Sequence, residues 1–255
     1  MLVKFNYLQT LICQMKHFII ALSLFFLFIN SNTQAQLNTN YTSLQNALKK
    51  PYMVYRLLLT KQSLETYPEE IVRLRFLQVL SLSKNKLKQI SPSIKKLKNL
   101  KELFLSENQL KELPSEIGQL VYLQMLFARA NQLETLPASI GKLKYLKSLY
   151  LNDNKFATFP ESLTKLYNLK SLILDYNQLK SLPKSIGNLA RLEYLSISDN
   201  QLTSLPKEIE KMRNLKSLSL SGNKFTKIPD CLFKLKNLKS LYLSNGQKIT
   251  FRFRK

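Results

Sequence analysis

An asparagine recurs every 23 residues along this chain, and this period constrains the fold more than any other feature. The asparagine occupies seven positions in phase: Asn85, Asn108, Asn131, Asn154, Asn177, Asn200 and Asn223. Around it runs the pattern LxxLxLxxNxLxxLPxxIxxL, which the segment from Leu100 to Leu120 shows in full. A unit this short cannot bury its own apolar face, so we expect consecutive units to stack and share one core.

Each unit predicts the same local structure. Side chains alternate along a strand, so the two leucines of LxL point inward and the residue between them faces solvent. The Asn amide can pair with backbone groups in the turn after the strand. The proline is expected in the first turn of a short helical segment, whose Ile and Leu face the core. The predicted fold is an α/β solenoid, with about nine strands in a concave parallel sheet and short helical or 3-10 segments on the convex side.

This repeat resembles the leucine-rich-repeat family, and the resemblance covers residues 54 to about 246. The variant LPxxIGxL, intact in Leu113–Leu120 and Leu136–Leu143, is similar to that of intracellular scaffold proteins and of secreted spirochaete (leptospiral-type) repeat proteins. The resemblance implies a right-handed β-α superhelix that binds another macromolecule and catalyses nothing. Likeness to the secreted group implies a bacterial surface protein whose partner is a host surface receptor.

An apolar block precedes the repeats. Residues 18–29 are almost entirely apolar, follow Lys16 and His17, and precede a polar run. This is the anatomy of a secretory signal peptide, and the block is shorter than the about 20 residues that a stable transmembrane anchor needs. We therefore expect a signal peptide over residues 1–35, starting at Met1 or Met15, and a secreted or cell-envelope protein. The alternatives are a buried helix that packs on the repeats and a cytoplasmic signalling scaffold with an unprocessed leader.

The rest of the chain divides into three predicted parts. Residues 36–53 form an N-terminal cap, in which residues 41–50 are expected to be helical with Leu44, Ala47 and Leu48 on one face. Residues 54–246 form the solenoid. Residues 247–255 form a C-terminal tail, whose alternating Phe and Arg residues indicate an edge strand unless the reading frame is truncated.

The net charge of +23 favours an anionic partner such as an acidic glycan, a lipid headgroup or nucleic acid. We disfavour nucleic acid because the lysines recur with the repeat and no nucleic-acid-binding motif is present. The basic ladder just before the predicted strands comprises Arg73, Arg75, Lys96, Lys98, Lys142, Lys144, Lys165, Lys211, Arg213, Lys234 and Lys236. Past the strands lie Glu107, Asp153, Asp175 and Asp199, so the two rims of the sheet are expected to carry opposite signs. The ladder either binds an anionic glycan or lipid or is a solvated face that keeps the chain soluble.

The residue between the inward leucines is free to vary without harming the core. Along the stack it reads Leu58, Ser81, Phe104, Phe127, Tyr150, Ile173, Ser196, Ser219 and Tyr242. Four large apolar residues in the middle are typical of an interface, although Phe, Tyr and Ile also suit strands on their own. The flanking serines favour the interface. The predicted protein-binding surface comprises Phe104, Met125, Phe127, Arg129, Tyr150, Asn152, Asp153, Ile173, Asp175 and Tyr194.

Nothing in the sequence points to catalysis. The one histidine lies in the leader, and the one cysteine beyond it is Cys231, expected to be an exposed free thiol. Ser-His-Asp, Cys-His and zinc sites are therefore excluded. Asp153 and Asp175 could form a carboxylate pair for glycoside hydrolysis, but an open curved sheet is not expected to hold a sealed pocket. The chain is predicted to be a non-enzymatic protein-binding module with no cofactor and no metal.

Overall fold

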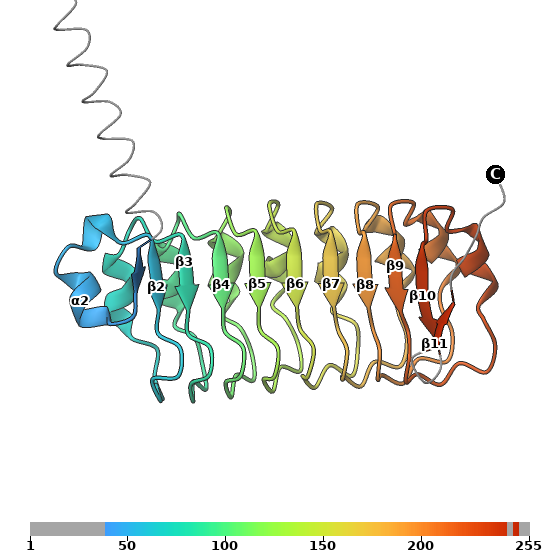
Figure 1. The fold of residues 1–255 in the computed structure, drawn as a ribbon, viewed down its shortest axis with the longest axis horizontal. Helices are drawn as coiled ribbons and strands as arrows, with labels where there is room; N and C mark the ends of the chain where they lie inside the picture. The colour runs from blue at the N-terminus through green and yellow to red at the C-terminus, as the bar shows by residue number, and fades with distance from the viewer. Residues whose placement is uncertain (1–38, 244–246, 250–255) are drawn as a thin grey trace, which may run out of the picture.

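The computed structural model describes residues 39–243 and 247–249 of the chain. A single sheet of 11 strands runs through them in sequence order, with 3-10 helices behind it (Figure 1). Strands β1 to β10 are parallel, and β11 pairs antiparallel with β10. The strands are β1 (Asn40–Tyr41), β2 (Arg56–Leu58), β3 (Val79–Ser81), β4 (Glu102–Phe104), β5 (Met125–Phe127), β6 (Ser148–Tyr150), β7 (Ser171–Ile173), β8 (Tyr194–Ser196), β9 (Ser217–Ser219), β10 (Ser240–Leu243) and β11 (Gln247–Ile249). The predicted leader and the tail beyond Ile249 lie outside the described residues.

Paired residues on neighbouring strands from β2 to β10 are 23 residues apart in the sequence, which is the period of the repeat. Pairing of β4 with β5 places Leu103 beside Leu126 and Phe104 beside Phe127, and the same offset recurs from β2 to β10. These are the strands that the repeat predicts, so the solenoid is confirmed. Strand β1 extends the first edge of the sheet, and β11 covers the other edge.

The helical segments lie on the side of the sheet away from the viewer in Figure 1. One short α-helix, α2 (Leu44–Leu48), precedes the repeats, and it buries Ala47 and packs Leu44 and Leu48 against the core. The 3-10 helices are η1 (Pro51–Met53), η2 (Glu69–Arg73), η3 (Pro92–Lys96), η4 (Ser115–Gln119), η5 (Ala138–Lys142), η6 (Glu161–Lys165), η7 (Lys184–Asn188), η8 (Lys207–Lys211) and η9 (Asp230–Lys234).

The repeat prolines lie one residue earlier than the sequence predicts. Pro114 is the N-cap of η4, with φ −66° and ψ 149°, and is not in the first turn. The cap residue keeps an extended backbone and contributes only its carbonyl, which accepts a 3.0 Å hydrogen bond from the Ile117 N–H. A missing proline N–H therefore costs nothing at this position. Only Pro92, which is shifted by one place in its repeat, occupies the first turn among the described repeats.

Buried asparagines join each repeat to the one before it. The Asn131 side chain donates to the carbonyls of Leu105, Ala128 and Arg129 over 3.0, 3.2 and 3.2 Å. Its Oδ1 accepts a 3.1 Å hydrogen bond from the Leu110 N–H. The amide thus satisfies backbone groups that the turn would otherwise bury unpaired, as the sequence analysis expects.

Three glycines let successive 3-10 helices approach closely. A Cβ atom on Gly118 in η4 would overlap the backbone oxygen of Ser139 in η5. A Cβ atom on Gly141 would lie 2.9 Å from the backbone oxygen of Ser162 in η6, and one on Gly187 would lie 2.5 Å from that of Glu208 in η8. All three contacts are with backbone, which cannot rotate away, so these helices need glycine at their interface.

We expect Gly118→Ala to lower the free energy of unfolding by about 1–3 kcal/mol, because η4 and η5 must separate to admit the methyl group. Urea denaturation of the two proteins measures the difference. Gln119→Ala is the control, because Gln119 is the exposed neighbour of Gly118 in η4. Equal stability of Gly118→Ala and the unaltered chain would contradict the close contact.

Candidate binding surface

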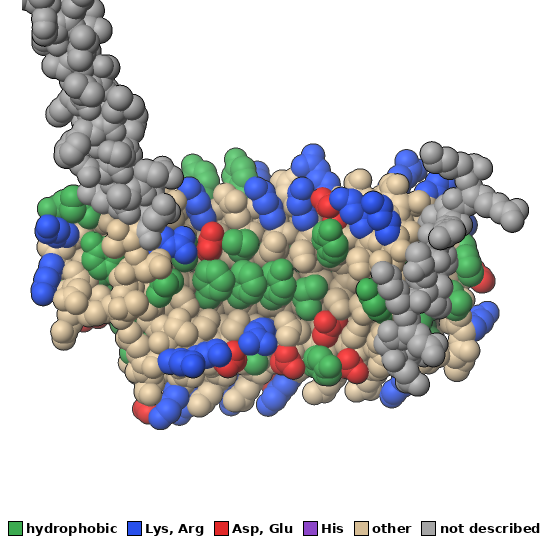
Figure 2. All heavy atoms as spheres, in the orientation of Figure 1, with side chains coloured by type: hydrophobic (Ala, Val, Ile, Leu, Met, Phe, Trp, Pro, Cys, Tyr) green, Lys and Arg blue, Asp and Glu red, His purple; other side chains and the backbone are tan. Residues whose placement is uncertain are grey.

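Three aromatic rings from consecutive strands lie face to face on the solvent side of the sheet. The ring centroids of Phe104 and Phe127 are 4.8 Å apart, with an interplanar angle of 15°. Those of Phe127 and Tyr150 are 4.3 Å apart, with an angle of 8°. The sheet register places Ile173 of β7 next to Tyr150. These four residues, named here the aromatic row, appear as the hydrophobic band across β4 to β7 in Figure 2.

The aromatic row is half-buried, because each ring covers part of its neighbour. Met125 lies in β5 on the same face as Phe127 and is also half-buried. Tyr194 lies in β8, three strands away from Met125 in the same column of the register, and is 49% exposed. The structure therefore brings together the row and Met125, and it leaves Tyr194 apart from the stacked rings.

Polar side chains follow the aromatic row at the ends of the strands. Arg129 donates to Glu107 Oε1 over 2.8 Å, and Lys84 lies 3.6 Å from the same oxygen. The Asn152 amide donates to Asp153 Oδ2 over 2.6 Å. These contacts pair rim side chains with one another, and the side chains remain partly exposed to solvent.

Asp175 is the most enclosed acidic group of this rim. Its Oδ1 accepts 2.6 Å hydrogen bonds from the Ser196 hydroxyl and the Ser198 N–H. Burial raises the pKa of the Asp175 carboxyl, these two hydrogen bonds oppose the rise, and the charges of Asp199 and Asp153 add to it. The same carboxylates raise the pKa of the Tyr176 phenol, with Asp199 contributing most. Acidic charge is therefore concentrated beside β6 to β8.

The expected contrast between the two rims holds for only part of the sheet. Glu107 is paired with both Lys84 and Arg129, so the acidic rim is confined to Asp153, Asp175 and Asp199. In Figure 2, Lys and Arg side chains gather along the upper edge of the face, while acidic side chains mix with basic ones below the hydrophobic band. The two rims thus carry opposite charge along β6 to β8, whereas both signs are mixed along β3 to β5.

The basic ladder lies farther from the concave face than predicted. Six members, Arg73, Lys96, Lys142, Lys165, Lys211 and Lys234, are the last residues of 3-10 helices, and the others follow in the turn before the strand. A second basic series, which the sequence analysis missed, immediately precedes the strands: Lys101, Lys147, Lys170, Lys216 and Lys239. Its signal was the same 23-residue spacing, one residue before each predicted strand. Glu193 interrupts this series and pairs with Lys170 and Lys216.

Cys231 is half-buried, which corrects the expectation of an exposed thiol. Its side chain packs against the hydrophobic core at η9. Burial raises the pKa of the Cys231 thiol above its usual range. The thiol is therefore less ionised at neutral pH than that of a free cysteine, and so less reactive.

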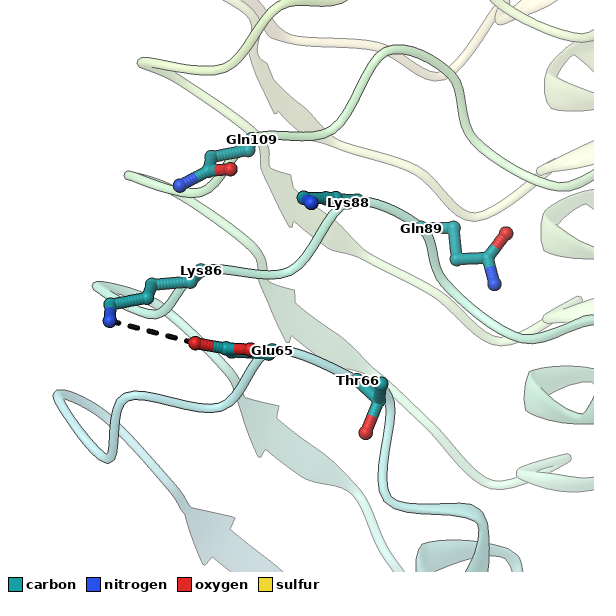
Figure 3. Close-up of a pocket in the computed structure, with 6 residues that line it drawn as sticks. All are labelled: Glu65, Thr66, Lys86, Lys88, Gln89 and Gln109. Atoms are coloured by element: carbon teal, nitrogen blue, oxygen red, sulfur yellow. Dashed lines mark ion pairs between the residues drawn. The ribbon is translucent and has the colours of Figure 1, made fainter.

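A polar hollow of about 540 Å³ lies among the loops that follow β2 to β4 (Figure 3). Glu65 and Lys86 form an ion pair of 3.7 Å across it, with both side chains more than half exposed. Thr66, Lys88, Gln89 and Gln109 line the rest of the hollow. Such solvated polar groups are ordinary surface and supply no buried anchor for a ligand.

Within residues 39–243 and 247–249, no three His, Cys, Asp or Glu side chains gather in a way that could hold a metal ion. No helix among the described residues has the length and apolar character needed to cross a bilayer.

The sequence matches the family described as "Leucine-rich repeat region" over residues 99–182 and 176–254. It also matches the family described as "Leucine Rich repeats (2 copies)" over residues 75–117. No curated protein matches the chain.

Similar folds occur in solved structures of plants and bacteria. The plant peptide hormone receptor RGFR1 in complex with RGF2 is 35% identical, with a TM-score of 0.67, and the match covers 76% of this chain and 32% of the receptor chain. An internalin, inlF, of Listeria monocytogenes is 26% identical, with a TM-score of 0.68, covering 76% of this chain and 56% of the internalin. A repeat protein of Leptospira interrogans is 29% identical over 82% of both chains, but its TM-score of 0.37 is too low to support a structural argument. The chain thus spans about a third of the plant receptor and about half of the internalin.

Proposed function

Because the chain belongs to the leucine-rich-repeat family, we propose that it is a non-enzymatic binding module that holds a protein partner against the aromatic row. We propose further that the chain is exported through its leader and that the partner is a host surface receptor. The aromatic row carries the proposal for the site. The leader and the likeness of the repeat to secreted bacterial proteins support the proposal for export and for the partner.

The position of the aromatic row within one register column is the central observation. Phe104, Phe127, Tyr150 and Ile173 share this column with Ser81 and Ser196, which flank them on β3 and β8. Strand preference accounts for a bulky residue at any of these places but not for an apolar block bounded by serine on both sides. A contiguous apolar surface with a polar margin is typical of the centre of a protein interface.

The polar margin can orient a partner on the row. Arg129, Asn152 and Asp175 follow the strands that carry Phe127, Tyr150 and Ile173, two residues farther along the chain. Opposite charges on the two sides of the later strands would steer a polarised partner into one orientation, mainly by raising its association rate. The plant peptide hormone receptor RGFR1, which has a similar fold, was solved in complex with RGF2, and this likeness supports a protein or peptide partner.

Phe127→Ser and Tyr150→Ser test the proposal with a residue that the fold already uses in this column. The probes are peptides selected from a random phage-displayed library on the unaltered chain, and their dissociation constants are measured by calorimetry. We expect each substitution to weaken binding by about 2 kcal/mol or more, roughly thirtyfold, because truncation removes a central anchor.

The control is Tyr52→Ser, because Tyr52 is 63% exposed and lies in η1, away from the aromatic row. Ring stacking also supports the sheet, so each serine variant is expected to lose about 0.5–1.5 kcal/mol of stability, which urea denaturation measures separately. Selected peptides that bind the double variant as tightly as the unaltered chain would rule out the aromatic row as the site.

A further inference from the structure

A second exposed surface lies on another edge of the solenoid, where the 3-10 helices end and the chain turns toward the strands. It is a groove of about 620 Å³ at η4 to η6. Val121, Tyr145 and Tyr167 supply its apolar walls, and Lys98, Lys142 and Lys144 supply its charge. None of its apolar walls belongs to the aromatic row, so the groove is independent of the proposed protein-binding site.

Two glycines line the groove, Gly118 and Gly141. A Cβ atom at either position would meet the backbone of the next 3-10 helix. The close approach of successive helices that these glycines allow also brings the flanking side chains of three repeats to one place. The groove is shallow, and tyrosine rings and lysine ammonium groups surround it.

The apolar walls are well exposed to solvent. Val121 is 44% exposed, Tyr145 54% and Tyr167 59%. Tyr122, which is 51% exposed, adds a further ring whose centroid lies 6.0 Å from that of Tyr145 at 30°. A gathered group of exposed rings on a soluble domain usually marks a place where something binds.

The charge of the groove is uncompensated. Among the described residues, no ion pair involves Lys98, Lys142 or Lys144, and no carboxylate lines the groove. By contrast, Lys170, Lys216 and Lys234 elsewhere on this side of the chain are held by Glu193 or Glu210. Three unpaired ammonium groups favour an anionic occupant, and the net charge of +23 disfavours a second copy of the chain.

We propose that this groove binds an acidic polysaccharide. Sugar rings present apolar faces that can lie on Tyr145 and Tyr167, while the carboxylate or sulfate groups of the polymer meet the lysines. Lysine is a flexible point charge, so it tolerates anionic groups that arrive at different angles along a polymer, whereas arginine favours one planar geometry.

The rest of the basic ladder fits a linear polymer. Lys96, Lys165 and Lys211 repeat the position of Lys142 at the ends of η3, η6 and η8, whereas Gln119 and Asn188 hold it in η4 and η7. A polymer that occupies the groove therefore meets further cations on both sides, at uneven intervals. Single-stranded nucleic acid is the competing ligand, because its bases can stack on one face of an exposed ring. We disfavour it because the sequence contains no nucleic-acid-binding motif.

Heparin binding by the full chain tests the proposal, measured by calorimetry at about 0.15 M salt, where long-range charge effects are largely screened. The groove variant is Lys142→Gln with Lys144→Gln. Its matched control is Lys211→Gln with Lys236→Gln, which removes the same charge from another part of the ladder. We expect the groove variant to weaken binding by about tenfold or more and the control by about threefold or less.

Tyrosine variants test the contribution of the rings. Tyr145→Ala is expected to weaken heparin binding by about threefold to tenfold, because it removes an apolar platform, whereas Tyr52→Ala should leave it unchanged. The double variant Phe127→Ser, Tyr150→Ser should bind heparin like the unaltered chain, so failure of the protein-binding proposal and failure of this one are distinguishable.

Four results would overturn the proposal. The groove variant and its control could lose binding equally, which would indicate diffuse charge attraction. Tyr145→Ala could have no effect. Heparin could bind no better than uncharged dextran. A single-stranded oligonucleotide of equal charge could bind as tightly and depend on the same residues, which would identify nucleic acid as the ligand.

Discussion

Asn131→Asp is expected to lower the free energy of unfolding by about 3–5 kcal/mol at neutral pH, because it buries a negative charge with no cation beside it and removes three donated hydrogen bonds. The amide of Asn131 donates to three backbone carbonyls and is only 9% exposed. An ionised carboxylate in its place has no proton to donate and faces three carbonyl oxygens. Urea denaturation at a series of pH values measures the loss.

The loss in free energy of unfolding caused by Asn131→Asp should become smaller as the pH falls. Burial and the surrounding carbonyls favour the protonated carboxyl, so the pKa of Asp at this place is raised in the folded state above its unfolded value. The folded protein then binds the proton more tightly, and the destabilisation grows as the pH rises through the folded pKa. Asn188→Asp, at an exposed position at the end of η7, is the control and should show little change. An Asn131→Asp protein as stable as the unaltered chain at neutral pH would contradict a donating role for this amide.

Phe156→Ala is expected to cost about 3–5 kcal/mol, because it leaves a cavity between repeats that cannot collapse independently. Phe156 is fully buried and is among the largest side chains in the core. It occupies the place that Leu133 and Leu179 hold in the repeats on either side. Its backbone N–H donates to Asn177 Oδ1 over 3.0 Å, and this hydrogen bond survives the substitution, so the loss reports packing alone.

Phe156→Leu restores the residue type of the neighbouring repeats and should cost less, about 1–2 kcal/mol. Phe76→Ala is the exposed control, because the Phe76 side chain is 48% exposed. Urea denaturation of the three variants gives the comparison. If Phe156→Ala and Phe76→Ala lost equal stability, Phe156 would not be an anchor of the core.

The fold was predictable because the period fixes the register. Once Leu103 and Leu126 occupy equivalent places in successive units, only one parallel pairing aligns them, and that pairing also aligns Phe104 with Phe127. The aromatic row therefore followed from spacing alone. The stacking of its rings did not, because it depends on side-chain rotamers, and those rings support the sheet as well as offering a surface.

The remaining features depend on contacts that the repeat motif does not describe. The edge groove exists because Gly118 and Gly141 let three repeats approach closely, which brings Tyr145 and Tyr167 beside Lys142. These positions vary from repeat to repeat, so periodicity does not single them out. Cys231 was predicted to be exposed for a similar reason, since its burial depends on how η9 packs on the core.

The buried asparagines give the stack a polarity. Each one holds the backbone of the preceding unit: Asn154 donates to the Ala128 carbonyl and accepts from the Leu133 N–H, and both groups belong to the repeat of Asn131. Removing repeats from the C-terminal end would therefore leave a backbone carbonyl and an N–H of the last remaining repeat without their asparagine partner. Removing repeats from the N-terminal end would leave the backbone groups of the remaining repeats paired. Shortened forms of this protein should tolerate loss at the beginning of the array better than loss at its end, and any terminal cap has more to replace on the C-terminal side.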